Sequence, residues 1–179
     1  MAINRNDSMR MQEHAEIGAG LRSHDGLHWK TRTVCEKYRG VGAEREAEPY
    51  EVLEVEGNIA VNGGIALLLD LLMGVGGTAY NAANSYLAVG SGSTNPTDPT
   101  QTALATQLAR AGMESTFPSR ASQTVTFKAV FNTAGSDGAW NEWAIFNNST
   151  TGTMLNRKVA SLGTKAGGTW TLTVTITPS

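Results

Sequence analysis

The chain of 179 residues has one cysteine, three histidines and no excess of either charge. A single cysteine excludes an intrachain disulfide, and nothing in the composition indicates an oxidising compartment. With 14 basic and 16 acidic residues the formal net charge is -2. Proteins that bind nucleic acid usually present a basic surface, so we expect no nucleic-acid partner.

Long apolar runs are also missing. The most apolar stretch, Ile65 to Val75, is far shorter than the roughly 20 residues that cross a bilayer, and Asp70 interrupts it. The first residues, Met1 to Glu16, lack the apolar centre of a secretory signal. We therefore expect no membrane partner and synthesis in the cytoplasm of a cell.

Charge is unevenly distributed along the chain. Residues 1–56 hold 8 Lys or Arg and 11 Asp or Glu, whereas the other 123 residues hold only 11 charges. Such a segment buries too little apolar area to offset its own ordering entropy. The sequence predicts that residues 1–49 are an extended arm docking on neighbouring subunits, with four large side chains as its anchors: Leu21, Leu27, Trp29 and Tyr38.

A helix over residues 63–73 follows the arm. Asn62 is a suitable N-cap, a run of Leu and Ile follows Gly64, and Gly74 is a typical helix stop. Asp70 is the only charge in the helix, so we expect nearly every face to be covered, most simply by a sheet. The sequence therefore predicts one buried helix.

The rest of the chain has the pattern of strands separated by Gly-rich turns. Residues 169–177 alternate strictly between Thr and large apolar residues, which predicts one face toward a core and the other toward water or a neighbour. Gly135 to Gly138 resemble a hairpin turn between two strands. The expected strands are residues 50–57 (a first or edge strand), 85–90, 124–133, 140–146, 154–160 and 169–177. The sequence predicts that residues 50–179 form an antiparallel β-sandwich or open barrel.

Possible sites for chemistry are few, and each has a simpler explanation. His24, His28 and Cys35 could bind zinc, but Gly26 weakens a helix there and no fourth ligand has suitable spacing. Gly74, Gly76 and Gly77 follow a helix instead of preceding one, so they are better explained as a cap and turn than as a phosphate loop. We therefore expect no metal and no cofactor.

Glu142 is the carboxylate most suggestive of catalysis, because it lies between Trp140 and Trp143 in an apolar strand. The sequence offers it no second carboxylate or nucleophile. A structural ion pair with Arg157, or else with Arg110, explains it better, and we expect the pair Glu142 and Arg157. The four tryptophans, which also include Trp29 and Trp170, could stack on sugars but more often fill cores and interfaces. No enzymatic activity is expected.

Three fragments together resemble a small domain family of virion structural proteins of tailed bacteriophages. The fragments are Ala88 to Gly92 (AVGSG), Glu142 to Phe146 (EWAIF) and Gly152 to Arg157 (GTMLNR), in the order A-V-G-x-G, E-x-x-[IL]-F and G-x-M-x-x-R. The resemblance covers about two thirds of the chain and excludes residues 1–56. Members are variously labelled tail-fibre, minor tail or head-associated proteins.

The resemblance implies a non-enzymatic structural protein located in the virion. We expect a capsid-associated cement or decoration subunit that the arm anchors to the major capsid protein or other virion subunits. Subunits of this kind are commonly used in symmetric copies, so a homo-oligomer is expected, with a trimer favoured. The alternative is a tail-fibre or baseplate attachment protein that binds the host surface.

Overall fold

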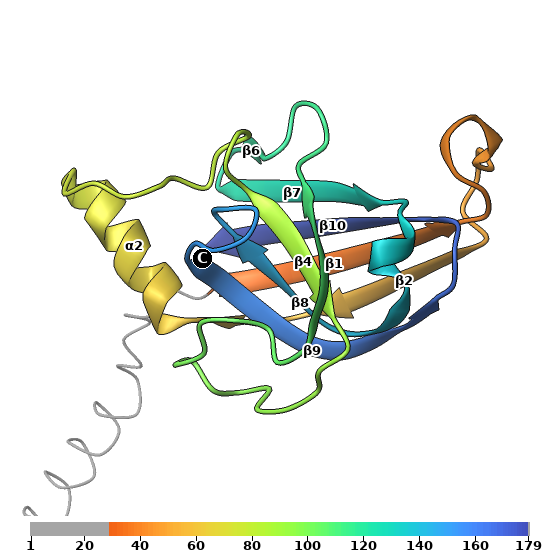
Figure 1. Cartoon of the computed structure of the whole chain (residues 1–179). Coiled ribbons are helices and arrows are strands. Elements are labelled where there is room, and N and C mark those ends of the chain that lie inside the picture. Colours follow the sequence, from red (N-terminus) through yellow and green to blue (C-terminus); the bar gives the residue numbers. More distant parts are fainter. Residues whose placement is uncertain (1–28, 179) are drawn as a thin grey trace, which may run out of the picture.

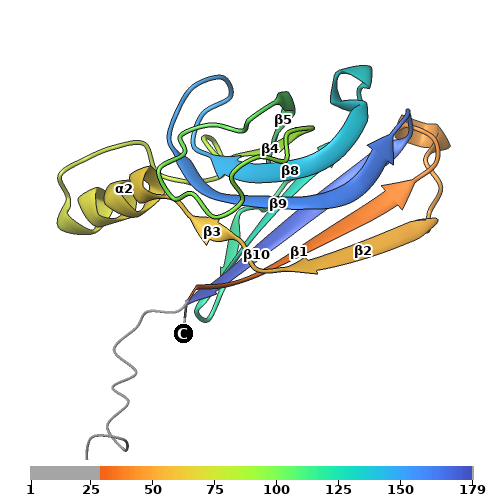
Figure 2. The ribbon, with the colours of Figure 1, turned by 90° about the horizontal axis from the view of Figure 1, so that it is seen from below.

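The computed structural model describes residues 29–178, which form two antiparallel five-stranded sheets packed face to face, with one α-helix at one end (Figures 1 and 2). Sheet A has the order β2 (Glu51–Glu56), β1 (Trp29–Tyr38), β10 (Thr169–Pro178), β7 (Thr124–Phe131) and β6 (Ser119–Ala121). Sheet B has the order β3 (Ile59–Ala60), β9 (Met154–Lys165), β8 (Gly138–Phe146), β4 (Tyr86–Gly90) and β5 (Gln107–Gly112). The predicted mainly β sandwich is confirmed.

Strand β1 corrects the predicted boundary between arm and domain. Trp29–Tyr38 lies inside sheet A, where it pairs with β10 on one side and β2 on the other. The chain then passes through a short 3-10 turn, Gly42–Glu44, and returns as β2, which is an edge strand as expected. Residues 29–49 therefore belong to the domain, and only residues 1–28 of the predicted arm lie outside the described part.

The expected hairpin between residues 124–133 and 140–146 does not form. Strand β7 belongs to sheet A and β8 to sheet B, so the connection, which includes the 3-10 turn Ala134–Ser136, carries the chain from one sheet to the other. A second crossing, through Gly167 and Gly168, joins β9 to β10, and both glycines have positive φ. The Gly-rich turns were recognised correctly, but their flanking strands pair with other partners.

The core between the sheets is closed by aromatic side chains at the end where these crossings occur. Trp140 packs edge-on against Phe131 and Trp170, with ring centroids 4.9 Å away in both cases. Its indole Nε1 donates a hydrogen bond to Ser136 O at 2.8 Å. Trp143 is buried beside them and donates to Thr33 Oγ1 at 3.1 Å. These contacts satisfy the polar atoms of both indoles within the core.

The alternation in β10 determines how sheet A faces the core. Trp170, Leu172, Val174 and Ile176 are all buried between the sheets. The threonines lie on the outer face, where Thr171 is buried and Thr173 to Thr177 are partly exposed. The Thr175 hydroxyl donates to Arg32 O, and Thr124 and Thr177 share a hydrogen bond, so part of the outer face is satisfied within the sheet.

Candidate assembly surface

Helix α2 (Asn62–Met73) lies against sheet B through a glycine contact. A Cβ added at Gly64 would lie 2.6 Å from Leu155 O and 2.8 Å from Met154 O, which is closer than real Cβ contacts. The backbone just before the helix is held too, because Val61 N donates to Leu155 O at 3.2 Å. The N-cap is Val61, one residue before the predicted Asn62, and it makes no side-chain cap. The start of the helix is therefore positioned by close packing on β9.

The other end of α2 is fixed by a left-handed cap and by two side chains beyond it. Gly74, with φ 70°, ends the helix at the predicted residue. Tyr80 Oη donates to Thr153 O at 3.1 Å, and Asn147 Nδ2 donates to Thr78 O at 2.7 Å. Both contacts join the segment after the helix to the turn between β8 and β9. The helix is thus held at both ends on sheet B.

The predicted burial of this helix is wrong, because only one of its faces is covered. Gly64 and Leu67 are its only buried residues, and Leu68 and Leu71 are partly buried. Five of the eight large apolar residues that are exposed in the described part lie in α2 or just after it: Ile65, Leu69, Leu72, Met73 and Val75. Leu72 is 81% exposed. We call the four helical members, Ile65, Leu69, Leu72 and Met73, the outer stripe.

The spacing of the outer stripe shows that it is one continuous face. Its members are separated by four, three and one residues, so at 3.6 residues per turn they span about 100° of the helix surface. An apolar stripe of that width normally faces a protein core. Here it faces away from the domain, so α2 presents apolar surface on two sides.

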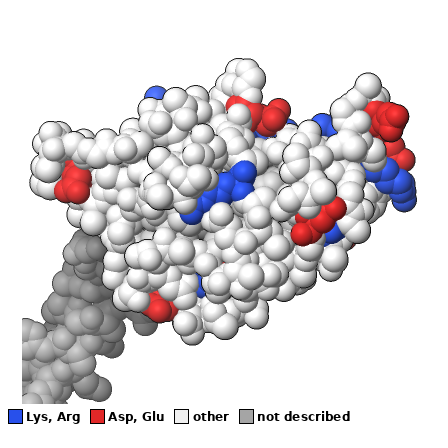
Figure 3. All heavy atoms as spheres, in the orientation of Figure 1, with Lys and Arg blue, Asp and Glu red and all other residues white. Residues whose placement is uncertain are grey.

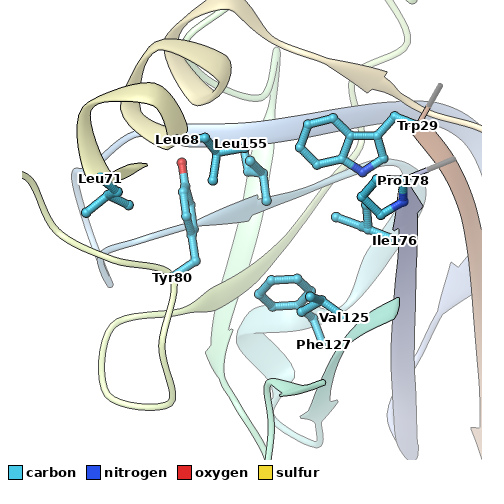
Figure 4. A pocket seen from close by; sticks show the side chains of 9 residues that line it. All are labelled: Trp29, Leu68, Leu71, Tyr80, Val125, Phe127, Leu155, Ile176 and Pro178. Atoms are coloured by element: carbon cyan, nitrogen blue, oxygen red, sulfur yellow. The ribbon is translucent and has the colours of Figure 1, made fainter. Parts of the chain in front are cut away.

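The inner side of α2 borders an apolar cavity of about 370 Å³ at the open end of the sandwich (Figure 4). Leu68 and Leu71 line it from the helix, and Tyr80 lines it from the segment that follows. The remaining walls come from both sheets: Trp29, Val125, Phe127, Leu155, Ile176 and Pro178. Burial raises the pKa of the Tyr80 phenol. The outer stripe and this cavity meet on α2 and form the candidate assembly surface.

Charge is almost absent from this end of the molecule. Asp70 is the only charged residue in the sequence between Glu56 and Asp98. Figure 3 shows the α2 end nearly free of Lys, Arg, Asp and Glu on the face displayed, with colour concentrated at the opposite end. An exposed apolar surface without surrounding charge is typical of a protein contact.

The predicted pair of Glu142 and Arg157 lies on the outer face of sheet B, and both side chains are buried. Arg157 Nε donates to Glu142 Oε2 at 2.8 Å, and Nη2 lies 2.6 Å from the same oxygen. Glu142 also accepts backbone hydrogen bonds from Gly92, Ala105 and Thr106 at 3.1, 3.0 and 2.8 Å. The carboxylate is therefore fully engaged and has no free oxygen for catalysis. Arg110, the other possible partner, instead donates to Asn148 O and Thr151 O.

The ion pair holds residues 91–106 over sheet B. Arg157 Nη1 donates to Thr94 O at 2.9 Å, to Asn95 O at 3.1 Å and to Gln101 Oε1 at 2.5 Å. Beside the pair, Leu104 of this loop packs in a small second core. The other members of that core are Val61, Ala88, Ala144, Phe146 and Met154. The ion pair therefore lies at the centre of the contacts that hold residues 91–106 on the outer face of sheet B.

The structure describes two of the four predicted arm anchors, Trp29 and Tyr38. Leu21 and Leu27 lie outside the described residues. Trp29 is partly buried and lines the cavity, and Tyr38 is 6% exposed in β1, so both pack within their own domain. Trp29 packs at the cavity between the sheets, whereas Tyr38 lies on the outer face of sheet A, where the Arg45 guanidinium stacks over its ring.

The other residues considered for metal or sugar binding are the histidines, Cys35 and the tryptophans. His14, His24 and His28 lie outside it, and residues 29–178 contain no group of three or more metal-ligating side chains. Burial raises the pKa of the Cys35 thiol to about 12. Trp140, Trp143 and Trp170 are each at most 2% exposed, so they offer no platform for a sugar. Within the same residues, no helix is both long and apolar enough to cross a bilayer.

The outer stripe and the cavity were missed by sequence reasoning. The available signal was the scarcity of charge in the helix, where Asp70 is the only charged residue, and this scarcity was attributed to burial under a sheet. Whether an apolar helix is buried by its own chain or by another depends on tertiary packing, which periodicity does not specify.

Searches with protein-family models, among curated proteins and among solved structures found no match to this chain.

Proposed function

We propose that the protein is a non-enzymatic structural subunit of a tailed-bacteriophage virion, in which it decorates or cements the capsid. The observation that carries the proposal is the candidate assembly surface, an apolar helix face and cavity with almost no charge around it. A protein that works alone in water rarely exposes such a surface, whereas a subunit of an assembly buries it against a neighbour.

The residues that resemble the virion family support the proposal by the way they meet. The three fragments lie on the neighbouring strands β4, β8 and β9. Gly92 N from the first fragment and Arg157 from the third both bond Glu142 of the second. The resemblance therefore concerns residues that stabilise the fold. Structural proteins of one family would share such residues even though they catalyse no common reaction.

The neighbours in this proposal are the major capsid protein or other virion subunits, together with further copies of the same chain. A trimer is the favoured arrangement. The alternative, a tail-fibre or baseplate protein that binds the host surface, has less support, because Trp140, Trp143 and Trp170 are enclosed in the core and cannot contact a sugar.

Particle localisation tests the proposal. Virions would be purified from a lysate of the strain that encodes the chain, labelled with an antibody against residues 29–179, and reconstructed by electron microscopy. We expect label and density over the capsid, in clusters of symmetry-related copies. Density only at the tail would favour the alternative, and absence from purified particles would contradict both.

A further inference from the structure

No element of the described domain covers the outer stripe. A second free copy is poorly suited to do so through α2 alone. Twelve helical residues are roughly 18 Å long, and the stripe consists of only four side chains. A stable interface between separate proteins needs about 800 Å² per partner. The stripe is therefore more suitable for an element that is already tethered nearby, because a tether supplies an effective concentration in the millimolar range.

Residues 1–28, which we call the N-terminal segment, are tethered at the rim of this surface. The segment joins the domain at Trp29, and the Trp29 indole lines the same cavity as Leu68 and Leu71 of α2. An extended chain advances about 3.3 Å per residue, so 28 residues are far more than the reach across an 18 Å helix requires. The position of Trp29 thus places the start of the segment beside the surface.

The composition of the segment is compatible with an apolar, nearly uncharged surface. It has three Arg and four Asp or Glu, so its own charges nearly cancel. Its large apolar residues are spread along it and include Ile17 and Leu21, one helical turn apart in sequence, and Leu27 two residues before Trp29. These side chains match the stripe and the cavity in polarity.

Two buried polar atoms at the start of β1 also lack partners. Trp29 Nε1 and Thr31 Oγ1 make no hydrogen bond within the part of the chain that the structure describes. Buried donors of this kind are normally satisfied by an acceptor, either from protein or from water. Both atoms are shielded from solvent, so an occupant of the cavity does not contact them in this arrangement of the Trp29 side chain.

We propose that the outer stripe and the adjoining cavity bind the chain's own N-terminal segment in the free protein. A neighbouring subunit that binds the same surface has to displace the segment. This inference rests on the domain structure alone and holds whether or not the protein is a virion component.

Cross-linking in the full chain tests the proposal. Arg22→Cys would be combined with Ala66→Cys, an exposed position at the margin of the stripe, and treated with a short bis-maleimide at low protein concentration. The matched control combines Arg22→Cys with Gln123→Cys, which is exposed on the turn between β6 and β7. That turn is two strand spacings, about 10 Å, from β1, so both targets are within reach of an unbound segment.

We expect the Ala66 pair to form an intramolecular cross-link at least about tenfold faster than the Gln123 pair, which corresponds to about 1.4 kcal/mol of preference. Equal rates would overturn the proposal. A covalent dimer as the main Ala66 product would also overturn it, because the occupant would then come from another copy. The native Cys35 is completely buried and does not compete for the reagent.

A substitution in the outer stripe distinguishes binding of the N-terminal segment to the stripe from mere proximity of the two cysteines. Leu69→Ser in the Arg22 and Ala66 background should slow the cross-link several-fold, while Val52→Ser should leave it unchanged. The two side chains are 52% and 53% exposed, so the substitutions remove similar apolar surface at different places. Equal effects of the two substitutions would show that the stripe has no special role.

Discussion

Glu142 and Arg157 form an ion pair from which water is excluded: their side chains are 0% and 1% exposed, and every other bond they make holds the 91–106 loop. The pair belongs to two of the fragments that suggested a family. The geometry of the pair indicates a structural role, because the Glu142 carboxylate is surrounded by hydrogen-bond donors and is not exposed to solvent.

Replacing Glu142 by Gln should therefore be costly. The substitution leaves the Arg157 guanidinium buried without its counter-charge, and losing one partner of such a pair typically costs about 3–5 kcal/mol of unfolding free energy. Urea denaturation would measure the loss. The control is Glu54→Gln in the exposed pair of Arg32 and Glu54, where we expect a change below about 1 kcal/mol. Similar losses in both variants would contradict the structural role of the buried pair.

The glycines at the start of α2 provide a test of how the helix is seated. Gly64→Ala should destabilise the domain by about 1–3 kcal/mol, because the new methyl group would meet the backbone of Met154 and Leu155. Gly63→Ala meets only the Thr153 methyl group, at 3.6 Å, and should stabilise the helix by up to about 1 kcal/mol. Thermal or urea unfolding of both variants would check this. If the two changes had the same sign, α2 would not be pressed against β9.

Acid sensitivity should depend on Asp137. The hydrogen bond from Lys165 Nζ, 2.5 Å from Oδ1, lowers the pKa of the Asp137 carboxyl from its ordinary value of 3.8. A carboxyl whose pKa is lower in the folded state adds stability above the unfolded pKa and loses it as the pH falls through the folded pKa. The difference in unfolding free energy between wild type and Asp137→Asn should thus be constant above about pH 5 and shrink below about pH 4. A difference that persisted unchanged to pH 2.5 would argue against this linkage.

Cys35 should be inert in the folded protein. Burial is the main cause that raises its thiol pKa, to about 12, and the side chain is completely enclosed. Alkylation by iodoacetamide at pH 8, followed by mass spectrometry, should give no adduct in native buffer and a single adduct in urea. Rapid modification without denaturant would show that the β1 core opens readily.

The sequence predicted the sandwich best where apolar alternation was strict. In β10 every large apolar residue faces the core, and the apolar run between Asn62 and Gly74 located α2 to within one residue. The Glu142 and Arg157 pair could be predicted because a lone carboxylate in an apolar strand needs a cation.

Strand β1 was missed because three of its five inward positions are polar. Thr31, Thr33 and Lys37 face inward while Val34 faces outward, so no hydrophobic period is visible. Lys37 is buried nevertheless, because its ammonium group lies 2.8 Å from Glu51 Oε2 and 4.4 Å from the centre of the Trp170 ring. Compensation of this kind depends on residues far away in the sequence and cannot be recognised from local composition.

The pairing of Trp29 with Pro178 places both ends of the described chain on adjacent strands. Cα atoms at such positions are about 5 Å apart, so a short linker could join them and new termini could be opened elsewhere. A protein fused directly to Trp29 or Pro178 would emerge next to the cavity and α2, because both residues line the cavity. In a circular permutant opened at the exposed Gly42–Glu44 turn, the fused cargo would leave from the opposite end of the sandwich (Figure 1) and keep the helix face accessible for display.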